Sequence, residues 1–149
     1  LQIGKQTVNA IYDWDNYSTY YHKDLLGANN NIIISSPVIS GPKVYELINL
    51  LKEKQMSGVQ ITIVTWAPDS YRFGDAAYWM QLHEDMRQAG FYIKTVEESC
   101  ERFAVIDQEV VWYGNINLLA KDKVDDSIMR ILSKEIASEL MEITFGDNG

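Results

Sequence analysis

The residue types best suited to chemistry lie between positions 100 and 117, which read Cys-Glu-Arg-Phe-Ala-Val-Ile-Asp-Gln-Glu-Val-Val-Trp-Tyr-Gly-Asn-Ile-Asn. Apolar side chains alternate with their neighbours on both sides of Asp107-Gln108, where the chain must turn, so this stretch is predicted to be a β-hairpin. Arg102 and Asn117 then stand near the ends of adjacent strands. A guanidinium group at that place can bind phosphate oxygens through paired hydrogen bonds.

Cys100 is the only cysteine of the chain and the candidate nucleophile of this stretch. A thiolate can attack phosphorus, but the attack requires a thiol whose pKa is lowered. Glu97, Glu98 and Glu101 lie nearby in the sequence, and negative charges raise the pKa of a thiol. The sequence therefore predicts a poor nucleophile.

The spacing of these residues resembles the signature of the phospholipase D superfamily, which is His-x-Lys-x4-Asp followed some six residues later by Gly-Ser-x-Asn. Three positions of the signature match and three are replaced. In signature order, the residues found here are Cys100, Arg102, Asp107, Gly114, Asn115 and Asn117.

The resemblance assigns a task to each of these positions. In the superfamily the His attacks a phosphodiester phosphorus, a second His protonates the leaving oxygen, and the Lys and Asn hold the non-bridging oxygens. The resemblance thus implies that Arg102 and Asn117 keep a phosphate-binding pocket. With Cys100 in place of the His, we expect the degenerate site to be catalytically inactive. The alternative is an active phosphodiesterase or nuclease that uses Cys100 as its nucleophile.

The segments after the hairpin resemble a narrower group, the phospholipase D-like domains on the C-terminal side of bacterial helicases and related ATPases. The group pattern is Trp-Tyr-Gly-Ser-x-Asn and later acidic-Ser-x-Met-Arg, and this chain has Trp112 to Leu119 and Asp125 to Ile131 at those places. Superfamily members usually carry a Glu or Asp shortly after the Asn of the signature, and this residue orients the His. Asp126 matches it, with Asp125 a near substitute. The resemblance, from about Tyr21 to Leu140, implies an accessory domain of an ATP-dependent DNA or RNA helicase or a related ATPase. Such a domain would act in nucleic-acid backbone binding or in dimerisation.

Composition limits the other possibilities. A chain of 149 residues with 46% hydrophobic content forms one domain with one sizeable core. No apolar run has the length of a membrane span, which predicts no membrane association, and a single cysteine favours the cytoplasm. The net charge of −8 argues against a domain that binds nucleic acid tightly unaided. The chain ends suggest a fragment of a longer protein.

The order of the elements predicts an α/β fold, a mixed β-sheet flanked by helices on both faces, of the phospholipase D kind. Strands are expected at 31–36, 59–64 and 91–96, with a helix that starts at Ser40-Gly41-Pro42 between the first two, so those two strands should be parallel. An earlier helix should bury Trp14, Tyr17, Tyr21 and Leu25, and Ser133 should cap a final helix with Ile136, Ala137, Leu140 and Met141 inward.

Three other positions could be mistaken for a site. Arg72 lies in a loop after the second strand, where it is either a phosphate contact or simply exposed to solvent. The triplet His22-Lys23-Asp24 has the wrong spacing for the superfamily signature, so we interpret it as a solvated helix face. His83 lacks a neighbouring His or Cys at ligand spacing and is predicted to be a surface residue.

The resemblance also bears on cofactors and partners. Superfamily chemistry is free of metal, so neither a metal nor another cofactor is expected. Superfamily enzymes need two facing copies of the signature, and this chain has one. We therefore expect a twofold homodimer that brings Cys100, Arg102 and Asn117 of both subunits together.

Overall fold

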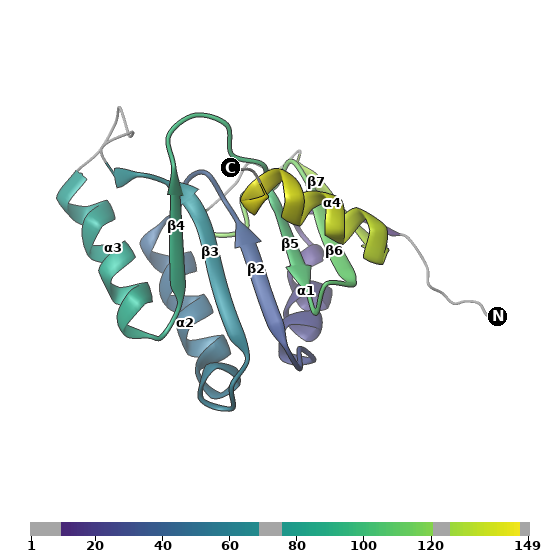
Figure 1. Cartoon of the computed structure of the whole chain (residues 1–149), viewed down its shortest axis with the longest axis horizontal. Coiled ribbons are helices and arrows are strands. Elements are labelled where there is room, and N and C mark those ends of the chain that lie inside the picture. Colours follow the sequence, from purple (N-terminus) through teal and green to yellow (C-terminus); the bar gives the residue numbers. More distant parts are fainter. Residues whose placement is uncertain (1–9, 69–75, 121–125, 147–149) are drawn as a thin grey trace.

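The structure, a computed structural model, describes residues 10–68, 76–120 and 126–146. Within these ranges it contains seven strands and four helices (Figure 1). In chain order they are β1 Ala10–Asp13, α1 Tyr17–Leu26, β2 Asn31–Ser35, α2 Gly41–Met56, β3 Gln60–Trp66, α3 Ala76–Gln88, β4 Tyr92–Val96, β5 Phe103–Ile106, β6 Val110–Gly114, β7 Ser127–Leu132 and α4 Lys134–Phe145.

All seven strands belong to one mixed sheet, in the order β1-β7-β6-β5-β2-β3-β4. Strands β2, β3 and β4 are parallel, as the helical connections between them require. Strands β5, β6, β7 and β1 are antiparallel to their neighbours, and β5 joins the two halves by pairing antiparallel with β2. The predicted hairpin is β5–β6, and the predicted parallel pair is β2–β3.

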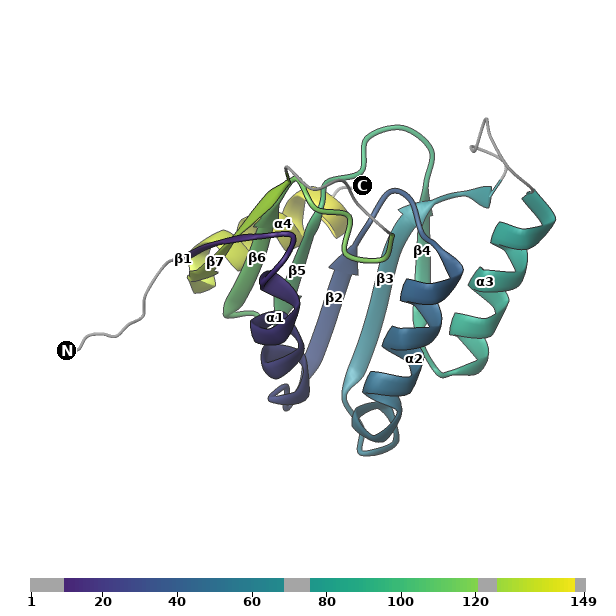
Figure 2. The ribbon, with the colours of Figure 1, turned by 180° about the vertical axis from the view of Figure 1, so that it is seen from behind.

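Helices cover both faces of the sheet, which confirms the predicted fold class. Helix α4 lies across one face (Figure 1), and α1, α2 and α3 lie on the other (Figure 2). The larger core fills the space under α1, α2 and α3, and its members include Tyr21, Leu51, Ile63, Leu82 and Trp112. A smaller cluster lies under α4 and is made of Ile33, Val64, Phe103, Val105, Val111, Ala137 and Leu140.

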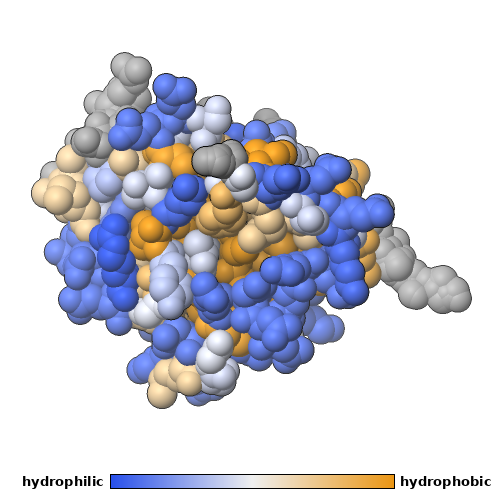
Figure 3. Space-filling model, viewed as in Figure 1, coloured by the Kyte–Doolittle hydropathy of each residue, from blue (hydrophilic) through white to orange (hydrophobic). Residues whose placement is uncertain are grey.

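The central position of β2 follows from its sequence. Ile32, Ile33 and Ile34 are all buried, because both faces of this strand are covered. Helix α2 packs Val44, Leu47 and Leu51 inward at helical spacing. Figure 3, seen from the α4 side, shows hydrophobic patches near the middle of this face that are interrupted by hydrophilic residues. None of the helices in the described part of the chain is long and apolar enough to cross a membrane.

Helix α1 differs from its prediction at the first position of the predicted buried stripe. Tyr17, Tyr21 and Leu25 are buried, but Trp14 precedes the helix and is 39% exposed. Residues just before Trp14 form strand β1, which the sequence did not predict. A strand of four residues at the edge of a sheet is too short for its alternation to be recognised.

The prediction that His22-Lys23-Asp24 is a solvated face was wrong for Asp24. Its Oδ2 accepts hydrogen bonds from Arg130 Nε at 2.6 Å and from Trp112 Nε1 at 2.8 Å, and its Oδ1 accepts one from Arg130 Nη2 at 3.0 Å. Asp24 thus fastens α1 to strands β6 and β7. Its partners lie about a hundred residues further on, so local spacing could not indicate them.

Two other burial predictions need correction. His83 is not a surface residue, since its exposed fraction is 1%. In α4, Ser133 is the cap, because its Oγ accepts a hydrogen bond from Ile136 N at 3.0 Å, and Ala137 and Leu140 are buried as predicted. Ile136 itself is 38% exposed.

Candidate functional site

The candidate site lies where the carboxyl ends of β2 and β3 meet the start of β5. Ser35, the last residue of β2, pairs with Phe103, and Phe103 pairs with Tyr113 of β6. Arg102 therefore comes just before β5, and its carbonyl oxygen accepts a hydrogen bond from Gly114 N at 3.4 Å. This backbone contact brings the start of β5 close to the segment that carries Asn115 and Asn117.

Arg102 and Asn117, which the sequence placed near the ends of adjacent strands, are in direct contact. Arg102 Nε donates a hydrogen bond to Asn117 Oδ1 at 3.0 Å. Asn117 is 8% exposed and is held by Ile116 and Leu118, which are part of the larger core, whereas Arg102 is exposed. The bond uses Nε, so the two terminal NH₂ groups of an oriented guanidinium are the donors that remain for an anion.

Cys100 faces a different side of the sheet from Arg102. Its Sγ lies 3.5 Å from Ser35 Oγ, and it packs against the cluster under α4. Phe103 belongs to that same cluster, so the preceding side chain, Arg102, points to the opposite face, where Asn117 lies. A cavity of about 140 Å³ adjoins the thiol and is lined by Ser35, Val64, Val96, Ser99, Cys100, Glu101, Ile143 and Thr144. Arg102 does not line it.

Burial raises the pKa of the Cys100 thiol above its ordinary value of 9.0. The hydrogen-bond contact with Ser35 and the positive charge of Arg102 oppose this rise, and the charge of Glu101 adds to it. The thiol is therefore protonated at neutral pH. The sequence indicated the direction of this shift, but burial and not the neighbouring carboxylates is its main cause.

Ser35 and Tyr113 hold Glu101 in place from two sides. Ser35 Oγ donates to the carbonyl oxygen of Glu101 at 2.6 Å, and Tyr113 OH donates to Glu101 Oε1 at 2.7 Å. The bond to Glu101 raises the pKa of Tyr113. Because Glu101 adjoins Arg102 in the chain, these two bonds restrict the backbone that carries the guanidinium. Neither contact could be found from the hairpin sequence alone.

Asp107 lies at the other end of β5 from Arg102. Its carboxylate accepts hydrogen bonds from the backbone N–H groups of Asn29, Asn30 and Asn31, at 3.0, 2.7 and 3.1 Å. Asp107 and Gln108 have φ angles of 54° and 57°, as a tight hairpin turn requires. In this structure Asp107 joins the hairpin turn to the start of β2, and it is not brought together with Arg102 and Asn117.

The other residues that the sequence singled out are Gly114, Asn115, Asp126 and Arg72, and each has different surroundings. Gly114 must lack a side chain, because a Cβ there would lie 2.6 Å from both Ile128 Cα and Ser127 O. Asn115 is exposed, and its N–H donates to Ser127 O at 3.0 Å. Asp126 is half-buried, and its carbonyl oxygen accepts a hydrogen bond from Trp14 N at 3.2 Å. Arg72 lies outside the described residues.

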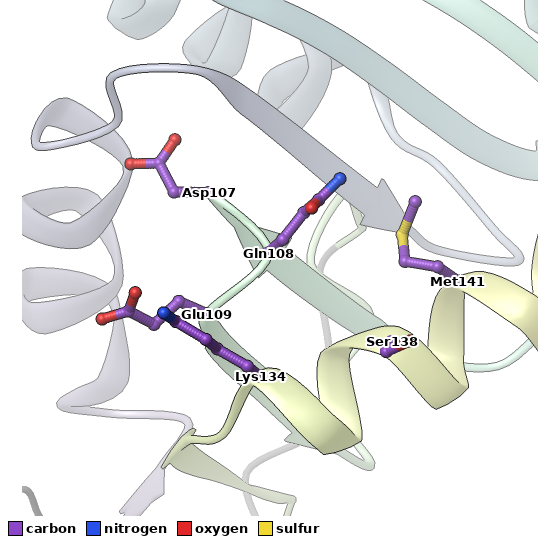
Figure 4. A pocket seen from close by; sticks show the side chains of 6 residues that line it. All are labelled: Asp107, Gln108, Glu109, Lys134, Ser138 and Met141. Carbon is purple, nitrogen blue, oxygen red and sulfur yellow. The ribbon is translucent and has the colours of Figure 1, made fainter.

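A second cavity, of about 440 Å³, lies at the hairpin turn (Figure 4). It is lined by Asp107, Gln108, Glu109, Lys134, Ser138 and Met141. Two carboxylates against one ammonium group make it a poor place for a phosphate. In the described ranges, moreover, the structure contains no cluster of three or more His, Cys, Asp or Glu residues that could hold a metal ion.

Comparison with known proteins defines the family. The family model described as "Cardiolipin synthase, PLD-like domain" matches residues 21–145. The chain therefore belongs to this family of phospholipase D-like domains. No curated protein is significantly similar to it in sequence.

Solved structures agree in fold. Nuc from Salmonella typhimurium, a phospholipase D family member, is similar with a TM-score of 0.70 and 13% identity over 91% of this chain and 90% of that one. NucT from Helicobacter pylori has a TM-score of 0.68 and 9% identity over 92% of each chain. The archaeal chromatin protein TrmBL2, whose structure is described as showing a novel mode of DNA binding, has a TM-score of 0.61 and 11% identity over 91% of this chain and 49% of that one.

Proposed function

We propose that this domain is a catalytically inactive phospholipase D-like module that binds a phosphate group of a nucleic-acid backbone at Arg102 and Asn117. The observation that carries the proposal is the 3.0 Å hydrogen bond from Arg102 Nε to Asn117 Oδ1, which orients an exposed guanidinium at one end of the sheet. An oriented guanidinium can donate two parallel hydrogen bonds to phosphate oxygens. The asparagine amide is the second polar group at the same place.

The inactivity of the module is supported by the position of Cys100. A nucleophile must reach the phosphorus that the anion-binding groups hold, within hydrogen-bonding range of the reacting atoms. Cys100 instead packs under α4, and burial raises the pKa of its thiol. Loss of a nucleophile removes most of the rate enhancement of an enzyme.

A nucleic-acid backbone is the phosphodiester that we favour as ligand. The similarity to a structure described as a DNA-binding chromatin protein supports this choice. The net charge of −8 limits what the domain can do unaided, because affinity for nucleic acid comes largely from cationic side chains that displace counterions. We therefore propose that the domain works as an accessory part of a DNA or RNA helicase or a related ATPase, as the patterns at 112–119 and 125–131 suggest. The complete open reading frame tests this by the presence of ATPase motifs.

Binding is tested by titrating the isotopically labelled domain with inorganic phosphate and with a short single-stranded oligonucleotide. We expect saturable shifts of the Arg102 Nε–H and Asn117 side-chain signals in the unsubstituted domain. In Arg102→Ala, the shift of the Asn117 side-chain signal on ligand addition should be lost. Lys52→Ala is the control, because Lys52 is an exposed cation on α2 outside the site. If Lys52→Ala weakens binding as much as Arg102→Ala does, the attraction is general and the site is not used.

Catalysis is tested with an activated phosphodiester, bis(p-nitrophenyl) phosphate. We expect the unsubstituted domain to hydrolyse this substrate no faster than buffer alone does. Turnover that disappears in both Cys100→Ser and Arg102→Ala would overturn the proposal and support the alternative, an active phosphodiesterase or nuclease with Cys100 as nucleophile.

A further inference from the structure

His83 is a buried polar side chain that the proposed phosphate site does not use. It lies on the inner side of α3 beside Leu82 and Met86, and its exposed fraction is 1%. Among the residues that the structure describes, neither ring nitrogen has a hydrogen-bond partner. A buried imidazole normally satisfies at least one of its nitrogens, since an unpaired buried polar group costs free energy. This exception requires a physical reason.

A cavity of about 500 Å³ adjoins this side chain. Its wall includes Pro68, Met80, Gln81, His83, Glu84 and Arg87. Met80, His83, Glu84 and Arg87 recur at intervals of three and four residues, so they share one side of α3. The cavity therefore combines a nearly enclosed imidazole with three apolar residues, which include Ala77, and three exposed polar ones.

The charges in this wall cancel. Glu84 Oε1 lies 3.8 Å from Arg87 Nη1, and Glu84 Oε2 accepts a hydrogen bond from Gln88 Nε2 at 3.2 Å. Burial, and to a smaller extent the charge of Arg87, lowers the pKa of His83, so the imidazole is neutral near pH 7. One carboxylate and one guanidinium favour neither an anion nor a cation. The net charge of −8 further disfavours an anion.

The polar groups present both donors and acceptors. A neutral imidazole offers one of each, the Gln81 amide offers both, Arg87 only donates and Glu84 only accepts. Pro68 and Met80 add apolar surface on which a flat ring can pack. A neutral, planar molecule with donors and acceptors side by side on its edge matches this wall, and a nucleobase has these properties.

We propose that this cavity binds a nucleobase through His83, Glu84 and Arg87. The cavity and its residues are separate from Arg102 and Asn117, so the inference does not rest on the proposed function. The ring nitrogens of His83 are covered, so the ligand must displace part of the wall. Met80 is 59% exposed and the Arg87 side chain 50% exposed, and both are long side chains that can rotate away.

The test uses the two histidines of the chain as probe and internal control. Ring ¹⁵N signals of His83 and His22 are followed while guanosine, adenosine, cytidine or uridine is added at millimolar concentration. We expect at least one nucleoside to shift the His83 signals saturably by more than 1 ppm while His22 is unchanged. No His83 shift with any nucleoside would overturn the proposal. An equal shift with ribose or with inorganic phosphate would also overturn it, because neither carries a base.

Two substitutions test whether the contact with Glu84 is specific, and an oligonucleotide tests whether the bound base is free or part of a strand. Glu84→Gln should weaken nucleoside binding about tenfold, whereas Glu53→Gln, an exposed position on α2, should leave it unchanged. Equal effects of the two substitutions would contradict a specific contact. A nucleoside response without a response to a single-stranded oligonucleotide assigns the cavity to a free nucleobase compound. A response to both assigns it to a base within a strand.

Discussion

Cys100 and Arg102 are two positions apart in the chain, but their side chains lie on opposite faces of the sheet. The thiol packs with Ser35 under α4, and the guanidinium contacts Asn117 on the side of the larger core. The loop before β5 does not keep the strict alternation of a strand, and this allows the two side chains to separate. The thiol therefore does not share the face on which Arg102 meets Asn117, although the charge of Arg102 still acts to lower the pKa of the thiol.

The thiol should react slowly with alkylating reagents. Because burial raises the pKa of Cys100, the reactive thiolate is scarce at neutral pH. We expect the rate of alkylation by iodoacetamide to rise with pH and to reach its midpoint above pH 9, the ordinary value for a cysteine. Since the chain has one cysteine, mass spectrometry assigns the product without ambiguity. A midpoint below that of an unstructured cysteine peptide would contradict the buried position.

Loss of the Asp24 carboxylate charge should destabilise the fold. Asp24→Asn weakens two bonds from Arg130 and one from Trp112, and it leaves a partly buried guanidinium without its counter-charge. We expect the free energy of unfolding in urea to fall by about 2 kcal/mol. The control is Glu46→Gln, which breaks an exposed pair with Lys43 at 3.8 Å and should cost less than about 0.5 kcal/mol. Equal losses in the two variants would refute the structural role of Asp24.

Stability should depend on pH through His83. Its pKa in the folded protein is lowered by burial, so the unfolded chain binds the proton more tightly. The free energy of unfolding should therefore be constant above the ordinary value of 6.5 and fall as the pH drops below it. His83→Phe should flatten this dependence between pH 7.5 and 5 in urea titrations. An unchanged slope would show that other groups cause the pH dependence, for example His22, whose pKa burial also lowers.

The close approach of β7 to Gly114 can be tested with alanine. Gly114→Ala places a methyl group against the backbone of Ser127 and Ile128, so we expect a loss of about 2 kcal/mol in the free energy of unfolding. Gly27→Ala is the matched control. A Cβ there would lie 3.5 Å from Lys23 O and 3.6 Å from Asp24 O, and the φ angle is −87°, so stability should change little. A similar loss in both variants would contradict the steric explanation.

The expected homodimer is tested by sedimentation equilibrium over a range of concentrations. A single copy of the signature in the chain predicts a species of twice the monomer mass, with Arg102 near the twofold axis. Arg102→Glu should weaken the dimer because it removes the hydrogen bond to Asn117 and puts two carboxylates, which only accept hydrogen bonds, near the axis, whereas Lys52→Glu on α2 should not. A monomer at the highest concentration would count strongly against the dimer.

Much of the fold could be predicted because its signals are local. The parallel strands, the β5–β6 hairpin and the Ser133 cap depend on periodicity and turn residues within a few positions. The sequence also indicated that Arg102 and Asn117 stand near the ends of adjacent strands, but not that they are hydrogen-bonded to each other. Contacts between distant residues were not predictable: Asp24 with Arg130, Asp107 with the amides of Asn29 to Asn31, and the burial of His83. In each case tertiary packing gives a polar residue surroundings that its neighbours in the sequence do not indicate.

The antiparallel pairing of β2 with β5 has a consequence for synthesis of the chain. Until residue 106 has emerged from the ribosome, β2 has β3 on one side and an open edge on the other. That edge belongs to an isoleucine-rich strand, and exposed apolar edges promote association with other chains. A nascent chain that stalls after β4 is therefore the form of this protein most exposed to aggregation and most dependent on chaperones.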